Sequence, residues 1–440
     1  MGMIRKSFNF RDSNGLRQDL LALKDSGDLK NIHKMFFQIY SSVLEEDKIK
    51  PVIGVIEEIF PDVPWIGNST SGNIVDSELG SDIVVSAMLF EDASSQFEFF
   101  QYDMQQMPVD DIAKNVLDEA AKRPWVKGIE IYYTISSVST TQFCDSLQGL
   151  PPGIQVFGGI VCSPDLTSPD SVVFSSVGGF CRSGILIVFY GGINFYLTAI
   201  KISGWQPLGR TFRVTRASGS VVYELDGRPA YEVYHKYLNI ANDENFFMNA
   251  LEFPMFYEHN GTTIVRAPAE CRFDGAVVMS SDIEVGSDLR LSYGEPNTIV
   301  NCVEQEGKRI DQFCPELVHI FSCAARKAFW SSREPTYEIY SLKKIAANSG
   351  FFSHGEFLRE NGHLNQHNIT LVMAGMREGE PHVIGRPLSQ LLDEKASPKL
   401  PLAARMATFI QEASKDLEDS NKKLQQANEA LQQMKKGKES

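Results

Sequence analysis

A strand–turn–helix unit that recurs along the chain constrains the fold more than any other feature. Residues 317–323 form an apolar run typical of a buried strand, and a helical stretch follows it. Residues 36–42 begin the same order near the N-terminus, and a looser copy begins at residue 129 with Gly158 and Gly159 after its helix. The first two units share a Gly-x4-Gly spacing, at Gly67, Gly72, Gly350 and Gly355. This alternation predicts an α/β fold with internal strand–helix–strand repeats and parallel strands in its sheets.

Composition narrows the class of protein. A chain of 440 residues is long enough for two or more domains, each with its own core. Its 43% hydrophobic and 22% charged residues are ordinary for a soluble globular protein. The formal net charge of −14 argues against a nucleic-acid partner, because such a surface needs clustered Lys and Arg.

Cysteine usage and hydropathy predict a cytoplasmic protein without a membrane span. The seven cysteines are odd in number and form no Cys-x-x-Cys pair, which favours reduced thiols over disulfides or structural zinc. The longest apolar run, residues 184–200, is divided by Gly191 and Gly192, so a β-hairpin is predicted there. The N-terminus lacks the apolar core of a signal peptide.

Five segments are predicted along the chain. Residues 1–31 form an N-terminal helical segment, and two α/β domains follow at 32–209 and 210–386. The boundary between them is placed where arginines and glycines interrupt the apolar runs. A proline-rich linker (387–401) leads to a helix at 402–440.

The final segment carries a heptad pattern. Apolar or small residues recur every seven positions and again three places later, among Lys, Glu, Gln and Asn. A helix this polar gains little from folding alone, so we expect a homodimeric coiled coil through residues 403–434. The two sets are Ile410, Leu417, Leu424 and Leu431, and Ala413, Ser420, Ala427 and Met434.

The end of the run at 317–323 is the predicted binding site. Arg326 falls in the first turn of the following helix, where backbone N–H groups favour an anion and the guanidinium can hold a carboxylate with two parallel bonds. Glu356 would then hold the ammonium of an amino acid. The predicted ligand-binding residues are Ser322, Cys323, Arg326, Glu356, Asn368 and Thr370, with Asn68, Ser69 and Thr70 on the equivalent turn of the first unit.

A thiol enzyme is the alternative function that the same residues suggest. A helix start and a nearby Arg favour the thiolate of Cys323. His319 lies about 13 Å away along the strand, too far for a proton relay, which leaves His354 as the candidate base. A buried, inert thiol is the commoner outcome for such a cysteine, and we expect no enzymatic activity.

The ordered motifs resemble the FIST sensory domain. Ser-Cys-x-x-Arg at 322–326, Gly-Glu at 355–356 and Asn-x-Thr at 368–370 are similar to its C-terminal half, as is the start at 223–230. The motifs at 66–72 and 157–159 are similar to its N-terminal half. Asn73 departs from the pattern, because the N-terminal half often has Glu there.

The resemblance implies a bacterial signal-input domain with a FIST N and a FIST C part that binds a small ligand such as an amino acid. In such proteins occupancy is relayed through a coiled coil to a histidine kinase or to a cyclic-di-GMP signalling protein such as a diguanylate cyclase. Some members bind haem and sense nitric oxide. The expected cofactor is therefore none, or a haem, for which His354 and His235 are the candidate axial ligands.

Overall fold

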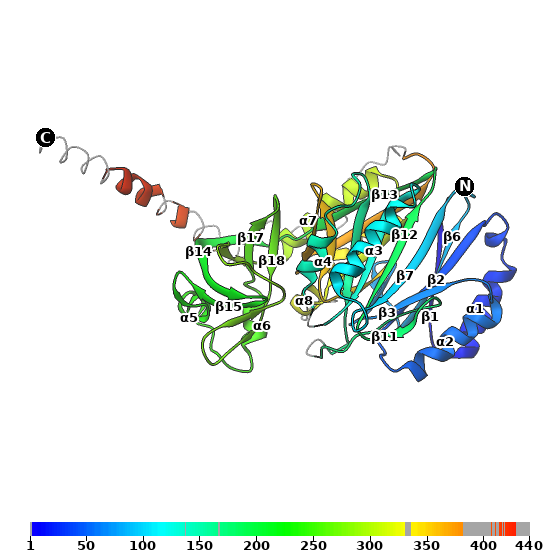
Figure 1. Cartoon of the computed structure of the whole chain (residues 1–440), viewed down its shortest axis with the longest axis horizontal. Coiled ribbons are helices and arrows are strands. Elements are labelled where there is room, and N and C mark those ends of the chain that lie inside the picture. Colours follow the sequence, from blue (N-terminus) through cyan, green and yellow to red (C-terminus); the bar gives the residue numbers. More distant parts are fainter. Residues whose placement is uncertain are drawn as a thin grey trace, which may run out of the picture.

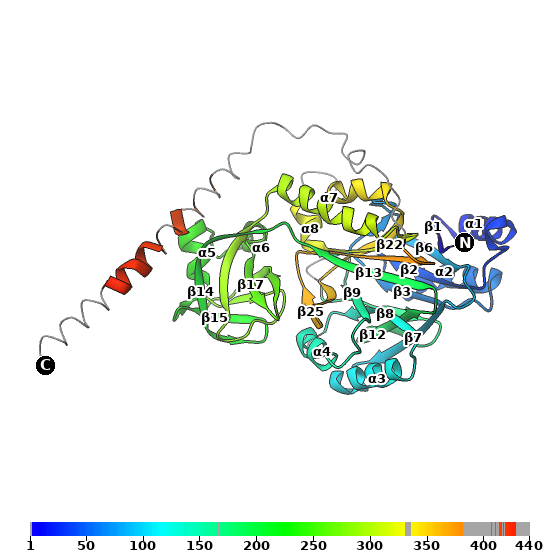
Figure 2. The same ribbon diagram turned by 90° about the horizontal axis from the view of Figure 1, so that it is seen from above.

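A β-rich body, a smaller β-domain beside it and a separate tail make up the protein (Figure 1). The computed structural model describes residues 2–136, 138–165, 168–330 and 336–381, and in the tail residues 406, 410, 413–415, 417 and 419–427. Two views show the small domain at the end of the body that lies opposite α1 and α2 (Figures 1 and 2).

The body contains three six-stranded sheets with the same strand order. In each sheet the two central strands pair in parallel and every other pair is antiparallel. Sheet 1 is β1 (Ile4–Asn9), β6 (Ile83–Phe90), β2 (Lys34–Ser41), β3 (Trp65–Ser69), β10 (Val173–Ser175) and β11 (Gly179–Cys181). Sheet 2 is β7 (Gln96–Asp103), β12 (Gly184–Gly191), β8 (Val126–Thr134), β9 (Gln155–Val161), β24 (Glu356–Glu360) and β25 (His363–His367). Sheet 3 is β13 (Phe195–Ile202), β26 (Leu371–Glu378), β22 (Leu317–Cys323), β23 (Ala347–Ser353), β4 (Asn73–Val75) and β5 (Glu78–Leu79).

Three tandem repeats therefore build the body, at residues 4–90, 96–191 and 195–378. Each repeat supplies four strands to its own sheet and sends a hairpin to another one. Hairpin β4–β5 of the first repeat joins sheet 3, β10–β11 of the second joins sheet 1, and β24–β25 of the third joins sheet 2. The structure confirms the predicted repetition, shows that the loose copy at residue 129 is a full repeat, and shows that the three repeats interlock.

The repeated glycines fit one register position of the parallel pair. Gly67, Gly158 and Gly350 lie opposite the isoleucines of β2, β8 and β22, which are Ile39, Ile131 and Ile320. A Cβ atom on Gly158 or Gly350 would overlap the carbonyl oxygen of the facing isoleucine. The recurring glycine therefore allows close approach of two strands.

A buried polar network occupies the interior that the three sheets share. Gln38, Glu130 and His319 hold equivalent positions on the central strands β2, β8 and β22. His319 Nδ1 lies 3.1 Å from Glu130 Oε1, and Gln38 Nε2 donates to the Tyr132 hydroxyl at 3.0 Å. Arg5 of β1 contacts both Gln38 and His319. Because buried polar groups must find partners, this network fixes how the sheets meet.

Helices cover the outer faces of the sheets. α1 (Ser13–Asp25) and α2 (Glu46–Ile59) pack on sheet 1, and α3 (Val109–Ala121) and α4 (Thr140–Ser146) pack on sheet 2. On sheet 3 lie α7 (Pro296–Gln312) and the 3-10 helix η2 (Tyr337–Lys344), together with the short α8 (Ala324–Phe329). A second 3-10 helix, η1 (Gly27–Leu29), follows α1. The central strands are thus buried on both faces of each sheet, which suits their near-continuous apolar runs.

The small domain is an insert within the third repeat, between β13 and α7. Its sheet has the order β18 (Thr262–Arg266), β17 (Met255–His259), β21 (Asp288–Tyr293), β14 (Gln206–Ser218), β15 (Val221–Leu225), β20 (Val277–Met279) and β19 (Pro268–Cys271), and β16 (Arg228–Pro229) pairs with β15. With α5 (Tyr231–Leu238) and α6 (Phe246–Ala250) it encloses its own apolar core.

Three sequence expectations need correction. The boundary expected at residues 209/210 falls inside the continuous strand β14, because the arginines that suggested a break lie on the exposed side of that strand. The segment at 1–31 contains strand β1 as well as α1. The two strands of the apolar run at 184–200 do not pair as a hairpin, since β12 joins sheet 2 and β13 joins sheet 3.

The linker expected at 387–401 lies outside the described residues, as does much of the segment at 402–440. The described tail residues are helical, and the heptad residues among them, including Leu417 and Leu424, are exposed. Among the described residues, no helix is both long enough and apolar enough to span a membrane.

Candidate functional site

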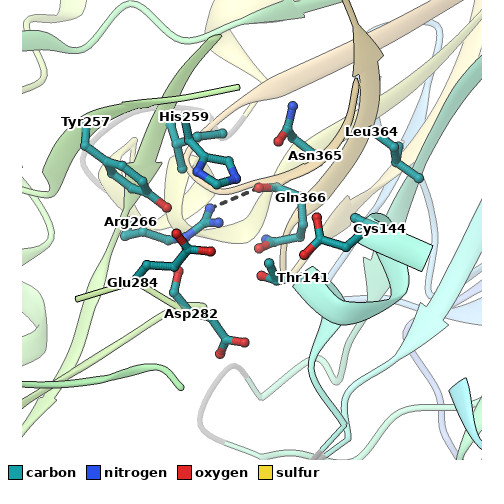
Figure 3. Close-up of a pocket in the computed structure, with 12 residues that line it drawn as sticks. Thr141, Cys144, Tyr257, His259, Arg266, Asp282, Glu284, Leu364, Asn365 and Gln366 are labelled. Atoms are coloured by element: carbon teal, nitrogen blue, oxygen red, sulfur yellow. Dashed lines mark hydrogen bonds between the residues drawn. The ribbon is translucent and has the colours of Figure 1, made fainter. Parts of the chain in front are cut away.

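A cavity lies where the insert meets the body (Figure 3). Figure 2 shows α4 and β25 on the side of the body that faces the insert. The cavity volume is about 30 Å³, which is room for a water molecule but not for an amino acid. The lining residues come from α4 (Thr141, Cys144, Asp145), from the insert (Tyr257, His259, Ile264, Arg266, Asp282, Glu284) and from β25 (Leu364, Asn365, Gln366).

Arg266, the last residue of β18, gives the cavity a buried positive charge. Its side chain is only 3% exposed. Nη1 donates to the Gln366 carbonyl oxygen at 3.1 Å and to Asn368 Oδ1 at 3.2 Å, but Arg266 makes no ion pair with any residue that the structure describes. Burying a guanidinium without a carboxylate is costly, so its charge suits an anion from outside the chain.

Two amide side chains next to Arg266 have polar atoms without partners. Asn365 and Gln366 are 5% and 2% exposed, and Asn365 Nδ2 and Gln366 Oε1 have no hydrogen bond within the described part of the chain. Both ring nitrogens of the next residue, His367, are also unpartnered, and burial, with Lys201 and Arg266 nearby, puts the pKa of His367 well below its usual value. Buried donors and acceptors of this kind normally meet water or a ligand.

Acidic groups face the same cavity from both sides. Burial raises the pKa of Asp145 on α4, His259 opposes that shift, and Glu284 adds to it. These three side chains are therefore close enough to influence one another across the junction. In Figure 3 the side chains of Tyr257, His259 and Glu284 gather around the guanidinium of Arg266, while the Asp282 carboxylate points away. The cavity thus has a cationic floor and an acidic entrance.

Arg326 lies elsewhere and is fully enclosed. Its Nε and Nη2 donate to the two carboxylate oxygens of Glu338 at 2.9 and 2.5 Å, and Nη1 donates to the carbonyl oxygens of Ser203 and Ile369. The guanidinium also packs over the ring of Trp205. Its ligand-binding role stays a prediction, and the geometry favours a tie between α8, η2 and the chain entering the insert.

Glu356 and Thr370, which were both predicted to bind the ligand, contact each other directly. The hydroxyls of Ser353 and Thr370 lie 2.6 and 2.5 Å from the two carboxyl oxygens of Glu356. Burial raises the pKa of Glu356 to about 8, although Ser353, Thr370 and Arg326 oppose the shift, so the carboxyl is mainly protonated at pH 7. A neutral buried carboxyl suits packing within the protein better than binding of an ammonium. Ser353, which sequence reasoning missed, completes this cluster.

Asn368 connects the Glu356 cluster to the cavity. Its Oδ1 accepts from Arg266, and its Nδ2 donates to the carbonyl oxygen of His354 at 3.1 Å. Asn368 and Thr370 flank Ile369, whose φ of 54° makes a sharp turn between β25 and β26. The Asn-x-Thr motif therefore shapes the chain between the cavity and the last strand of the body.

The predicted ligand-binding residues of the first unit, Asn68, Ser69 and Thr70, are buried, and so is the Cys323 thiol. The structure shows Ser69 Oγ accepting from the Val172 amide and Thr70 Oγ1 donating to the Phe352 carbonyl oxygen at 2.9 Å, while Asn68 Nδ2 donates to the carbonyl oxygen of the next residue. Burial raises the pKa of Cys323 well above its usual value, so the thiolate is disfavoured. Ser322 is buried beside it on β22.

The two candidate haem ligands lie apart from the Arg266 cavity. His354 is half-buried in the turn between β23 and β24, and its backbone N–H donates to the Ile160 carbonyl oxygen at 2.8 Å. His235 lies on the exposed side of α5. Neither residue lines the Arg266 cavity or the surface clefts that share residues with it.

Sequence reasoning missed the cavity because its residues come from three distant segments. The one local signal is Arg266, a charged residue directly after the buried run Ile264–Val265. Its neighbours Asn365 and Gln366 directly precede the Asn-x-Thr element on β25.

Comparisons with known proteins match most of the body. The FIST N domain model matches residues 36–228, and the FIST C domain model matches residues 230–359. Their meeting point lies within the insert. An uncharacterized protein of Methanocaldococcus jannaschii, MJ1623, is 30% identical over 188 residues, which is 40% of this chain and 34% of the relative. The match thus spans about a third of that relative's own length.

Proposed function

The chain belongs to the FIST family, whose domains are sensory signal-transduction domains, and from this premise we propose that it is a non-enzymatic sensor whose small ligand binds in the cavity between insert and body. The observation that carries this proposal is the buried charge of Arg266, which pairs with no carboxylate in the described part of the chain, beside one atom without a partner there on each of the Asn365 and Gln366 amides. A carboxylate group is the ligand chemistry that fits, because a guanidinium binds it with charge-assisted hydrogen bonds.

The size of the cavity supports a conformational response. An amino acid does not fit into about 30 Å³, so binding requires the insert to move away from α4 and β25. A ligand that binds the wider form shifts the population toward it by its difference in affinity for the two forms. The insert is joined to the body by two chain connections, one after β13 and one before α7.

The contacts of Arg266 provide a route toward the tail. A carboxylate that takes its donors competes with Asn368 Oδ1 and with the Gln366 carbonyl oxygen. Asn368 lies two residues before Thr370, after which β26 begins and leads to Glu378 and the chain toward the tail. We therefore propose that ligand binding changes the turn at 368–370 and, through β26, the segment that follows.

Removing the charge of Arg266 should abolish ligand binding. Arg266→Gln keeps a hydrogen-bonding side chain but loses the cation, so we expect the affinity for the best-binding amino acid to fall at least roughly thirtyfold. The twenty standard amino acids are screened by thermal shift, and the best is measured by calorimetry. Arg272→Gln, an exposed arginine of the same insert, is the matched control. Equal affinities for wild type and Arg266→Gln would rule out this site.

The output proposal is a homodimeric coiled coil at 402–440 that acts on a histidine kinase or a diguanylate cyclase. Leu417 and Leu424 are 64% and 60% exposed in the single chain, as expected for seam residues without their partner strand. The cytoplasm is the proposed location, since the seven cysteines are odd in number and contain no Cys-x-x-Cys pair, which favours reduced thiols.

Two charges in the heptad seam should separate the dimer. Leu417→Asp combined with Leu424→Asp places like charges at facing positions, so we expect a monomer in sedimentation equilibrium at concentrations where wild type is a dimer. Gln425→Asp, which adds a charge outside the seam, should remain a dimer. A dimer that persists in the double variant would contradict the coiled-coil proposal.

A further inference from the structure

The entrance to the Arg266 cavity is acidic. Two wider surface clefts, of about 750 and 650 Å³, share lining residues with it, and Asp110, Asp145 and Glu284 line the larger one. None of these three carboxylates makes an ion pair with a residue in the described part of the chain. Asp145 and Glu284 also line the inner cavity, so the acidic surface continues inward toward Arg266.

Exposed acidic side chains thus border the recess in which the Arg266 guanidinium is buried. A free dicarboxylate or phosphate would meet Asp145 and Glu284 before it reached Arg266, and like charges disfavour its entry. A simple amine would be attracted to the entrance but would offer nothing to the buried guanidinium. The recess fits a molecule with a carboxylate at one end and a cation at the other.

Resting on the proposed function, we infer that the ligand is a basic α-amino acid, bound with its carboxylate inward. Arg266 and the unpartnered Nδ2 of Asn365 donate to the carboxylate. The unpartnered Oε1 of Gln366 accepts from the α-ammonium group. Asp145 and Glu284 receive the cationic end of the ligand side chain at the entrance. The unpartnered amide atoms of Asn365 and Gln366 thereby each gain a partner of the correct polarity.

Calorimetry on the full chain, with free L-arginine and its uncharged or truncated analogues as ligands, tests this inference. L-arginine should bind at least roughly tenfold more tightly than L-citrulline, which is nearly isosteric but lacks the side-chain charge. Agmatine, which lacks the carboxylate, and L-glutamate should bind far more weakly than L-arginine. The arginine affinity should also weaken as salt rises from low ionic strength. Citrulline or glutamate binding as tightly as arginine would overturn the inference.

Two entrance variants separate this inference from the proposed function. Asp145→Asn and Glu284→Gln should each weaken arginine binding roughly tenfold and leave citrulline binding unchanged. Both carboxylates are exposed, so the variants should fold, and Glu270→Gln on β19 is the control acid of the same insert. Unchanged arginine affinity in both variants refutes the basic-ligand class. Arg266-dependent binding of an uncharged amino acid would then still support the cavity, whereas amino-acid binding that ignores Arg266 refutes both.

Discussion

Replacing Arg326 by Met should lower the free energy of unfolding by about 3–5 kcal/mol. The guanidinium and the Glu338 carboxylate are both buried, and they share two parallel hydrogen bonds of 2.9 and 2.5 Å. Removing the cation leaves the Glu338 carboxylate buried and uncompensated, and it also removes the donors to the Ser203 and Ile369 carbonyl oxygens. Chemical denaturation followed by circular dichroism measures the change.

The exposed pair Arg17–Glu58 provides the matched control. It has the same two-pronged geometry, with Nε–Oε1 and Nη2–Oε2 distances of 3.1 and 2.6 Å, but it lies at the surface of α1 and α2. Water replaces both partners there, so Arg17→Met should leave the denaturation midpoint nearly unchanged. The double variant Arg326→Met/Glu338→Leu should regain part of the lost stability, because no unpaired charge remains. Equal effects at Arg17 and Arg326 would contradict a structural role for the buried pair.

The repeat was predictable because its signals are local. The runs at 317–323 and 36–42 match β22 and β2, and the glycines recur because a parallel neighbour leaves no room for a Cβ atom. The exchange of hairpins was not predictable, since a hairpin such as β4–β5 has the same local sequence whichever sheet it joins. The insert was equally hidden, because β14 carries exposed arginines along a continuous strand and these resemble a break in sequence.

The binding site, too, was predictable only where its signals are local in sequence. The sequence placed Glu356 and Thr370 at one predicted site, and the pairing of β24 with β25 brings the two side chains into contact. Which of the two arginines, Arg326 or Arg266, can bind an anion depends on burial and on partners that are distant in sequence. Glu338 satisfies Arg326 from a 3-10 helix, whereas no described carboxylate pairs with Arg266. Whether an arginine has a carboxylate partner depends on the tertiary structure. An arginine beside a strand end therefore predicts an anion site only when no acidic side chain of the protein already pairs with it.

The second large effect is a pH dependence that comes from Glu356. Its pKa is about 8 in the folded protein because the carboxyl is buried, against an ordinary value of 4.5. Between pH 4.5 and 8 the folded state therefore holds one more proton at this site than the unfolded state does, so the free energy of unfolding decreases as pH rises. The stability that the protonated Glu356 carboxyl contributes is fully present below pH 4.5 and is lost as the pH rises through 8. Within this window the slope is roughly 1.4 kcal/mol per pH unit.

Glu356→Gln should remove this slope, because the amide is neutral at every pH and can still bond Ser353 and Thr370. We expect the variant to approach or exceed the wild type in stability at pH 8.5, with a smaller advantage or a loss at pH 5.5. Urea denaturation at both values gives the difference, and other titrating groups cancel because they are common to both proteins. Glu252→Gln, at an exposed position, controls for the substitution itself. Parallel pH profiles for wild type and Glu356→Gln would show that Glu356 is ionised in the folded state. The cluster beside Asn368 would then carry a negative charge. Arg326 would stabilise the Glu356 carboxylate in addition to the Glu338 carboxylate that it already pairs with.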